Sequence, residues 1–239
     1  MFSLIRFSFM FEPHLVIDLL KPQPGAHVLD LATHHGDTAI ALADAGCVVT
    51  AIDSSEKAIQ KCNEVLQQKN ITNVTALVMD AENLSFGENK FDGATCRMAT
   101  HHFDDVPRAL QQVASVLKEN APLIIGDSIS PDNRALGDFL MKIGRLRDST
   151  FKTLYTVDDW KNLLNKNGLK LVDYKLTKDT RDATRWLEHS PLSDEQKQRI
   201  HEAFVESPQE AKDYLQAKIV DGKIVEFTDD KILIKAVRL

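Results

Sequence analysis

The sequence predicts an α/β fold in which a mostly parallel sheet carries helices on both faces. Short apolar runs, typical of strands buried on both sides, alternate with amphipathic helical segments over the first 130 residues. Three of these runs end in an aspartate. After residue 130 the alternation gives way to mainly helical segments and two closing apolar runs. This order favours a parallel sheet that ends in an antiparallel edge.

Each element has its own local signal. Breakers such as "KPQPG" bound the helices, and glycines such as Gly46 and Gly168 close them. The expected strands are 26–32, 47–53, 74–80, 91–97, 121–129, 169–177 and the closing run "KILIKAVRL". The expected helices are 14–20, 37–46, one capped by Ser54 or Ser55, 105–117, 133–146 and 157–166. Two Ser-Pro pairs are expected to open further helices within 180–217.

The length of 239 residues is typical of one large domain. We expect an N-terminal helical arm over 1–25, a cofactor-binding half over 26–130 and a substrate-side half over 131–239. A helical insertion over 180–217 is expected to form a lid over the cleft. The apolar start "MFSLIRFSFMF" is interrupted by Arg6 and too short to span a bilayer, which favours an arm over a targeting segment.

Composition narrows the function classes. The net charge of −6 disfavours nucleic acid as a partner, and no segment predicts an integral membrane protein. The three cysteines are widely spaced, which is typical of free thiols in the reducing cytoplasm. We expect a small-molecule substrate, and a homodimer stays open.

Three aspartates, Asp30, Asp53 and Asp80, follow successive strands. The carboxyl ends of parallel strands meet at one edge of the sheet, so these side chains are expected around a single cleft. Asp53 at the end of the second strand is placed to accept hydrogen bonds from both ribose hydroxyls of an adenosine. The alternative is that each aspartate caps a helix, which explains one such residue better than three.

The loop after the first strand does not have the glycines of a nicotinamide site. The pattern G-x-G-x-x-G falls on Ala32, His34 and Asp37. The shorter pattern G-x-G-x-G falls on Ala32, His34 and Gly36, and keeps only the last glycine. A nicotinamide oxidoreductase is therefore disfavoured.

The segments "VLDLATHHG", "VTAIDSSEKAI", "MDAENLSF" and "FDGATCRMATHHFDDVPRALQQVASVLKENAPLIIGD" occur in this order. Together they resemble the class I S-adenosylmethionine-dependent methyltransferases, in the branch of the ubiquinone and menaquinone C-methyltransferases and many small-molecule methyltransferases. The resemblance is close over residues 12–130. It implies a Rossmann-like, seven-stranded mixed sheet in the order 3-2-1-4-5-7-6, with strand 7 antiparallel.

The resemblance also implies a set of cofactor contacts for S-adenosylmethionine. The methionine part of the cofactor would contact the loop after the first strand, with Asp30, Ala32, His34 and Gly36. The ribose would contact Asp53 and Ser54 at the end of the second strand, and the adenine would contact Asp80 and Ala81 at the end of the third. Arg97 and Met98, at the end of the fourth strand, would face the sulfonium.

Two departures from the family pattern support an alternative function. His34 stands where the family has its second glycine, and "KENA" replaces the "KPGG" turn before the fifth strand. The main expectation is methyl transfer to a small molecule. The alternatives are a catalytically degenerate relative that binds a ligand or partner without transfer, and a scaffold that binds a partner through the apolar arm.

Methyl transfer needs a base only when the acceptor must lose a proton. His101 and His102 follow the fourth strand and are the candidate catalytic residues, and the alternative is that they only order the loop. The four histidines of the two pairs do not have the spacing of a metal site, so no metal is expected. Aromatic and arginine side chains such as Trp186 and Arg181 suit either an anionic acceptor or lid packing.

Overall fold

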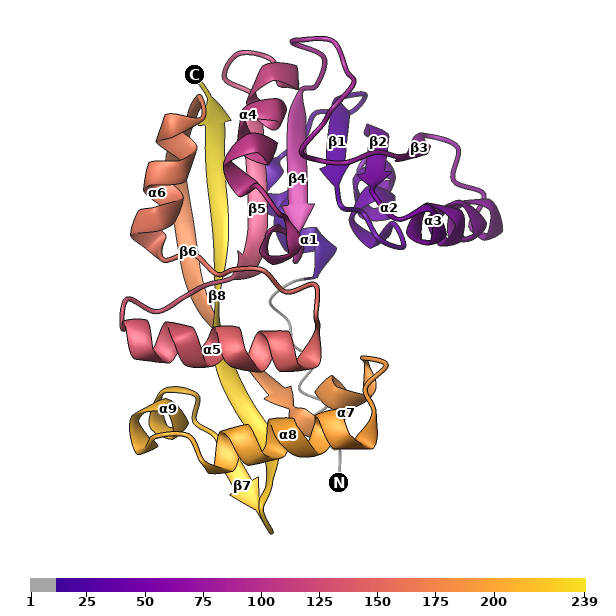
Figure 1. Cartoon of the computed structure of the whole chain (residues 1–239). Coiled ribbons are helices and arrows are strands. Elements are labelled where there is room, and N and C mark those ends of the chain that lie inside the picture. Colours follow the sequence, from indigo (N-terminus) through magenta and orange to yellow (C-terminus); the bar gives the residue numbers. More distant parts are fainter. Residues whose placement is uncertain (1–11) are drawn as a thin grey trace, which may run out of the picture. The chain divides into compact units, whose positions relative to one another are not determined.

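The computed structural model describes residues 12–239, so residues 1–11 of the expected N-terminal arm (1–25) lie outside the described residues. The strands are β1 (His27–Leu31), β2 (Val48–Asp53), β3 (Val74–Val78), β4 (Gly93–Arg97), β5 (Pro122–Ser128), β6 (Leu169–Asp182), β7 (Lys218–Val220) and β8 (Lys223–Arg238). The helices are α1 (Pro13–Leu20), α2 (Asp37–Asp44), α3 (Glu56–Gln68), the 3-10 turn η2 (Thr100–His102), α4 (Val106–Val116), α5 (Arg134–Arg147), α6 (Val157–Lys166), α7 (Ala183–Glu188), α8 (Asp194–Val205) and α9 (Gln209–Tyr214). Figure 1 shows them along the chain.

The sheet has the expected order with one strand added. Its eight strands run β3-β2-β1-β4-β5-β8-β6, and β7 pairs with β8. Strands β1 to β5 run parallel to one another. Strand β8 runs antiparallel to β5, because the Arg238 amide bonds the Ala121 carbonyl while the Ile129 amide bonds the Asp230 carbonyl. The predicted mixed Rossmann-like sheet is confirmed.

The expected count of seven strands was wrong because of a hairpin. Asp221 and Gly222 both have positive φ, 49° and 73°, the backbone of a tight two-residue turn. The turn folds β7 back onto the start of β8. The two closing apolar runs, expected as separate segments, form the single 16-residue strand β8.

The described residues form two compact units. The first, here called the sheet unit, holds residues 12–127, 158–175 and 232–239. The second, the helical unit, holds residues 128–157 and 176–231. Strands β6 and β8 each contribute residues to both units.

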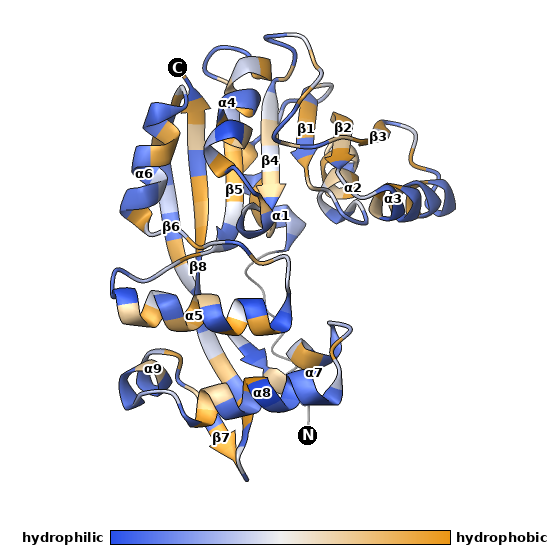
Figure 2. Ribbon diagram, viewed as in Figure 1, coloured by the Kyte–Doolittle hydropathy of each residue, from blue (hydrophilic) through white to orange (hydrophobic). Residues whose placement is uncertain are grey.

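The core of the sheet unit forms where helices pack on strands that are apolar on both sides. In Figure 2 the central strands are predominantly orange, and α3 is blue along its outer face. Figure 1 shows α4 on the near side of the sheet and α1 behind it. One core cluster joins α1 and α2 to four strands through buried side chains that include Val16, Leu42, Val28, Val49 and Ile124.

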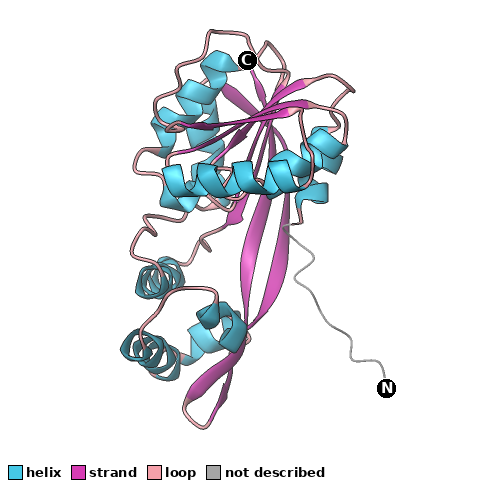
Figure 3. Ribbon diagram, turned by 90° about the vertical axis from the view of Figure 1, so that its right-hand side faces the viewer, coloured by secondary structure: helices cyan, strands magenta, loops and turns pink. Residues whose placement is uncertain are grey.

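The core of the helical unit joins α5, α7 and α8 to the first half of β8. Phe204 and Phe227 lie at its centre, with ring centroids 5.2 Å apart. The secondary structure around these helices is drawn in Figure 3. Helix α8 begins at a reciprocal cap, in which the Ser193 hydroxyl accepts from the Gln196 amide and the Gln196 side chain accepts from the Ser193 amide.

The expectation that Ser-Pro pairs open these helices was wrong in detail. The N-cap of α8 is Ser193 rather than Ser190, and Pro208 precedes α9 without a side-chain cap. The Ser207 hydroxyl instead donates to the Phe204 carbonyl and closes the preceding helix. Strand β6 also continues to Asp182, so the helices begin at Ala183 rather than at residue 180.

Candidate functional site

The loop after β1 turns through backbone conformations that usually require glycine. Ala32 has a φ of 50°, His34 of 52° and Gly36 of 89°. A side chain at Gly36 would also place its Cβ 2.7 Å from the Cys62 Sγ atom. The loop therefore keeps glycine at the tightest position and holds two other residues in the left-handed region, a strain that is common at binding sites.

Asp30 is a buried carboxylate at the base of this loop, with an exposed fraction of 1%. Its two oxygens accept hydrogen bonds from the Thr33 hydroxyl at 2.6 Å and the Thr95 hydroxyl at 2.7 Å. Burial raises the pKa of Asp30 to about 6, although both hydroxyls oppose the shift. Asp30 thus ties the loop to β4 through neutral donors.

Asp53 links the same loop to the end of β2. Its Oδ2 atom accepts from the His34 amide and its Oδ1 atom from the Ser55 amide, both at 2.9 Å. A carboxylate can accept about four hydrogen bonds, so about two positions remain for a ligand. Ser55, not Ser54, caps α3 by accepting from the Ala58 amide.

His34 and His35 stack on each other, with ring centroids 3.7 Å apart. Burial, together with the neighbouring His35, lowers the pKa of His34, so its imidazole is neutral near pH 7. The pair borders a groove of about 490 Å³ that Asp53 and Ser55 also line. The two imidazole side chains thus form part of the groove wall beside the loop, where glycines would leave bare backbone.

Asp80 and Ala81 follow β3, two strands from β1. The register pairs Asp53 with Val78, so Asp80 lies just beyond the end of β2. Its Oδ1 atom accepts from the Glu82 amide at 2.9 Å, and Ala81 is buried. The structure therefore brings Asp30, Asp53 and Asp80 to the same edge of the sheet, as expected.

Arg97 is the last residue of β4, and Met98 follows it. The Arg97 Nε atom donates to the Thr38 hydroxyl at 2.8 Å, and its Nη2 atom lies 3.7 Å from Asp37 at the start of α2. Met98 has a φ of 54°, and its amide bonds the Gly126 carbonyl of β5 at 2.7 Å. The chain beyond β4 is thus held to both neighbouring elements.

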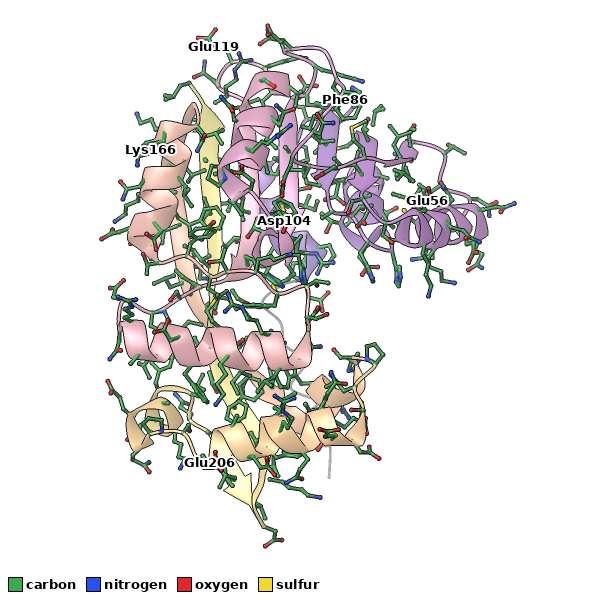
Figure 4. The ribbon with its side chains drawn as sticks, viewed as in Figure 1. Glu56, Phe86, Asp104, Glu119, Lys166 and Glu206 are labelled. Atoms are coloured by element: carbon green, nitrogen blue, oxygen red, sulfur yellow. The ribbon has the colours of Figure 1, made fainter. Side chains whose placement is uncertain are left out.

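His101 and His102 lie in η2, directly after this turn. The His101 Nδ1 atom is 2.5 Å from Asp127 Oδ1, and both residues are buried. The His101 and His102 rings are tilted against each other with centroids 4.1 Å apart. Figure 4 labels Asp104, which lies between η2 and α4 and whose amide donates to Glu82 near the end of β3.

Among residues 12–239, no cluster of three or more histidine, cysteine or acidic side chains has the arrangement of a metal site. The rings of each histidine pair contact each other, stacked for His34 and His35 and tilted for His101 and His102. None of the helices in the same range is long and apolar enough to cross a membrane.

The aromatic and arginine side chains of the helical unit have structural partners. Trp186 packs against Phe227 and beneath the Arg147 guanidinium, which lies 4.9 Å from the indole ring. Arg181 pairs with Asp179 at 3.0 Å and Asp229 at 3.3 Å. These contacts favour packing as the role of both residues.

The sequence analysis did not identify the buried residues that hydrogen-bond to the site residues and fix their positions. Asp127 ends the apolar run of β5 as Asp30 ends that of β1, so the same strand-end pattern would have identified it. Thr33, Thr95 and Thr100 carry no such signal, because a threonine is common in any strand or turn. Their roles are visible only from the hydrogen bonds that they donate.

The chain was compared with known proteins. A family model described as a methyltransferase domain matches residues 28–120. The uncharacterised methyltransferase YcgJ of Bacillus subtilis is 26% identical over 94% of this chain and 89% of its own length. The crystal structure of YcgJ has a TM-score of 0.92 at 25% identity, and the match covers 95% of this chain and 97% of YcgJ.

Two further relatives agree. A putative methyltransferase from Bacillus halodurans has a TM-score of 0.90 at 25% identity, over 95% of this chain and 98% of that protein. The 2-phytyl-1,4-naphtoquinone methyltransferase of Nostoc is 36% identical over 49% of this chain and 53% of its own length. The strand-end aspartates, the loop after β1 and these likenesses agree: the chain carries a methyltransferase domain over residues 28–120 and is similar to the class I S-adenosylmethionine-dependent methyltransferases.

Proposed function

We propose that this protein transfers a methyl group from S-adenosylmethionine to a small-molecule acceptor. The observation that carries the proposal is the geometry of Asp53. Its carboxylate is held by two backbone amides and keeps acceptor capacity at the edge of the sheet. A pair of vicinal ribose hydroxyls is the partner that such a carboxylate suits.

The residues present fit this cofactor. The left-handed turns at Ala32, His34 and Gly36 form the first loop, which would receive the methionine part. Asp53 and Ser54 would hold the ribose, Asp80 and Ala81 the adenine, and Arg97 and Met98 would stand near the sulfur. When bound, S-adenosylmethionine supplies an activated methyl group on a sulfonium.

Asp30 acts differently from the other aspartates in this proposal. Its oxygens are used by two threonine hydroxyls and are almost inaccessible to a ligand. We therefore assign it the task of fixing the loop against β4, so that the backbone that would meet the methionine part is already ordered.

The acceptor is proposed to be a small molecule that reaches η2, where His101 and His102 are the candidate bases. The Nostoc relative is named for a naphtoquinone, and a demethylmenaquinone methyltransferase of Thermotoga maritima is 31% identical over 50% of this chain. These likenesses make quinols and phenols the first acceptors to try. The helical lid, the cytoplasmic location and a homodimer stay predictions.

The test is transfer of a labelled methyl group from S-adenosylmethionine to a panel of quinols, phenols and small acids. We expect label in at least one acceptor, and a loss of transfer in Asp53→Ala at limiting cofactor. Asp44→Ala, which removes an exposed carboxylate of the same unit, is the matched control. Binding of S-adenosylhomocysteine without transfer to any acceptor class would instead favour the catalytically degenerate alternative.

A further inference from the structure

Asp127 is a buried carboxylate at the carboxyl end of β5 to which the proposed function gives no task. Its exposed fraction is 0%. Three donors from η2 converge on it: the Thr100 hydroxyl, the His101 amide at 3.3 Å and the His101 Nδ1 atom at 2.5 Å. So many donors favour the ionised carboxylate.

The contact with Asp127 decides which nitrogen of His101 carries the proton. An ionised carboxylate only accepts hydrogen bonds, so the Nδ1 atom must be the donor. In the neutral imidazole the lone pair then lies on Nε2, at the far side of the ring. The short bond to Nδ1 also fixes the orientation of the ring, because the carboxylate is itself held by Thr100.

His101 occupies a suitable place for proton transfer. It follows β4 in the sequence, and β4 lies directly beside β1, whose following loop would hold the methionine part of the cofactor. Its side chain is 9% exposed, so water competes little for the ring. A base held in one tautomer near the reacting end of the cofactor needs little reorganisation.

We propose that Asp127 is a positioning residue that holds His101 as the general base, with Nε2 as the atom that takes the proton. The inference rests on the proposed methyltransferase function and narrows its substrate class. The acceptor must carry a proton on the reacting atom, as in a phenol, an enol or an acidic C–H group.

The proton step is balanced. The O–H or C–H bond of the acceptor breaks, its electron pair stays on the acceptor, and the proton moves to Nε2 of His101. The imidazolium that forms stands beside the Asp127 carboxylate, which stabilises it. The proton later passes to water and restores the neutral ring.

Two other titratable groups lie close to the pair. The His102 ring, from the same turn, is tilted against that of His101 with centroids 4.1 Å apart. Cys96 on β4 is fully buried, and its burial raises the pKa of the thiol well above the usual range, with the Asp127 carboxylate adding to the shift. The thiol therefore stays protonated near neutral pH, and it does not compete for the proton.

The first test reads the tautomer in the wild-type protein without cofactor. Two-bond nitrogen–proton correlation spectra of nitrogen-15-labelled protein, followed across pH, distinguish the two neutral tautomers, and His101→Gln assigns the signal. We expect the Nδ1–H tautomer for His101, and its loss in Asp127→Asn. An Nε2–H tautomer in the wild type would overturn the proposal whether or not a substrate is known.

The second test uses the acceptor found by methyl transfer. Asp127→Asn should lower kcat by about 10²–10⁴ and remove the rise of kcat with pH through the imidazole range, while S-adenosylhomocysteine affinity stays within about twofold. If that variant does not fold, Thr100→Val removes one of the bonds to Asp127 and should give a smaller fall of the same kind. Asp92→Asn, a partly exposed aspartate that accepts from the His27 amide before β4, is the matched control and should keep the parental profile.

Parental kcat and an unchanged pH profile in Asp127→Asn or Thr100→Val would overturn this inference and leave the proposed function standing. Absence of S-adenosylhomocysteine binding in the wild type would instead overturn the proposed function, which the tautomer measurement does not depend on.

Discussion

The two compact units surround their carboxylates in opposite ways: Asp30 is buried among neutral donors, whereas Asp229 is partly buried beside two cations. In the sheet unit, Asp30 is surrounded by hydroxyls, and burial raises its pKa to about 6. In the helical unit, burial likewise raises the pKa of Asp229, but Lys231 and Arg181 more than offset it, and the net shift is downward. Lys231 lies 2.7 Å from Asp229, and Arg181 bridges Asp229 and Asp179.

The difference separates a carboxylate that orders the loop of the proposed cofactor site from one that holds the framework together. A buried charge that is matched by opposite charges can hold a strand in place, yet it offers nothing to a ligand. A buried carboxylate held only by neutral donors is kept at a cost in stability, and such groups gather at functional sites. Substitutions at Asp229, at Asp30 and at their partners should therefore affect stability in different ways.

Lys231→Met should cause the largest loss of stability. The Lys231 side chain is 1% exposed and also donates to the Ser128 hydroxyl, so its removal leaves the partly buried Asp229 with one cation fewer. Breaking such a pair costs about 3–5 kcal/mol of unfolding free energy. Urea denaturation of the wild type and of Lys231→Met measures this loss of unfolding free energy.

The double variant Lys231→Met with Asp229→Leu is the control for that experiment. It removes both charges, and most of the lost stability should return, because no uncompensated carboxylate remains. A double variant as unstable as the single one would show that the ion pairs are not what the strands require.

Asp30 should make stability fall as pH rises. Its folded-state pKa of about 6 lies above the unfolded value of 3.8, so the native state holds the proton between these values. The ionisation of Asp30 therefore lowers the unfolding free energy only as the pH rises from about 4 to about 6. Above about pH 6 this loss of unfolding free energy is complete, at about 3 kcal/mol. Asp30→Asn should remove this slope.

The measurement is urea denaturation of both proteins without cofactor, across that pH window. The difference between wild type and Asp30→Asn cancels the titration of all other carboxylates. A difference that does not change with pH would mean that Asp30 is not a strained buried acid, and the contrast with Asp229 would fail.

Most of the fold could be predicted from the sequence, because the spacing of apolar residues and the positions of glycine and proline determine secondary structure locally. The strand β1 and helix α3 are recognisable from a buried run and from an amphipathic stripe behind a serine cap. The hairpin of β7 was missed because the cue at Asp221 and Gly222 follows a segment with helical composition. The extension of β6 to Asp182 depends on its pairing partner, which no local pattern reveals.

The charged residues of the candidate site could be predicted from the sequence, but the groups that hydrogen-bond to them could not. Asp53 was expected to meet a ribose, but the amides of His34 and Ser55 that orient it depend on the folded loop. The loss of the "KPGG" turn was interpreted as a sign of degeneration. In the structure Asn120 adopts a φ of 60°, and asparagine tolerates this left-handed conformation better than most residues, so the turn survives without its glycines.

Asp53→Ala tests the ligand-facing member of the sheet-edge aspartates. Loss of hydrogen bonds to a charged group should weaken S-adenosylhomocysteine binding by about 1.5–3 kcal/mol, measured by calorimetry. Asp44→Ala should bind as the wild type does. Unchanged affinity in a folded Asp53→Ala protein would remove the ribose assignment.

His34→Gly should have the smallest effect and the opposite sign. Glycine adopts the φ of 52° without strain and allows a ligand to approach the backbone, so S-adenosylhomocysteine should bind more tightly by up to about 1 kcal/mol. His35→Gly, at a neighbouring position without positive φ, should give no such gain. Weaker binding by His34→Gly would instead identify the imidazole as a ligand contact.

The most direct test of the account is calorimetric titration of the wild-type protein with S-adenosylhomocysteine and, separately, with NAD. We expect saturable binding of S-adenosylhomocysteine at one site per chain and no binding of NAD. In Asp53→Ala, the binding of S-adenosylhomocysteine should be lost or strongly weakened. Binding of NAD alone, or of neither ligand by the folded protein, would contradict the claim that the edge formed by β1, β2 and β3 is a site for S-adenosylmethionine.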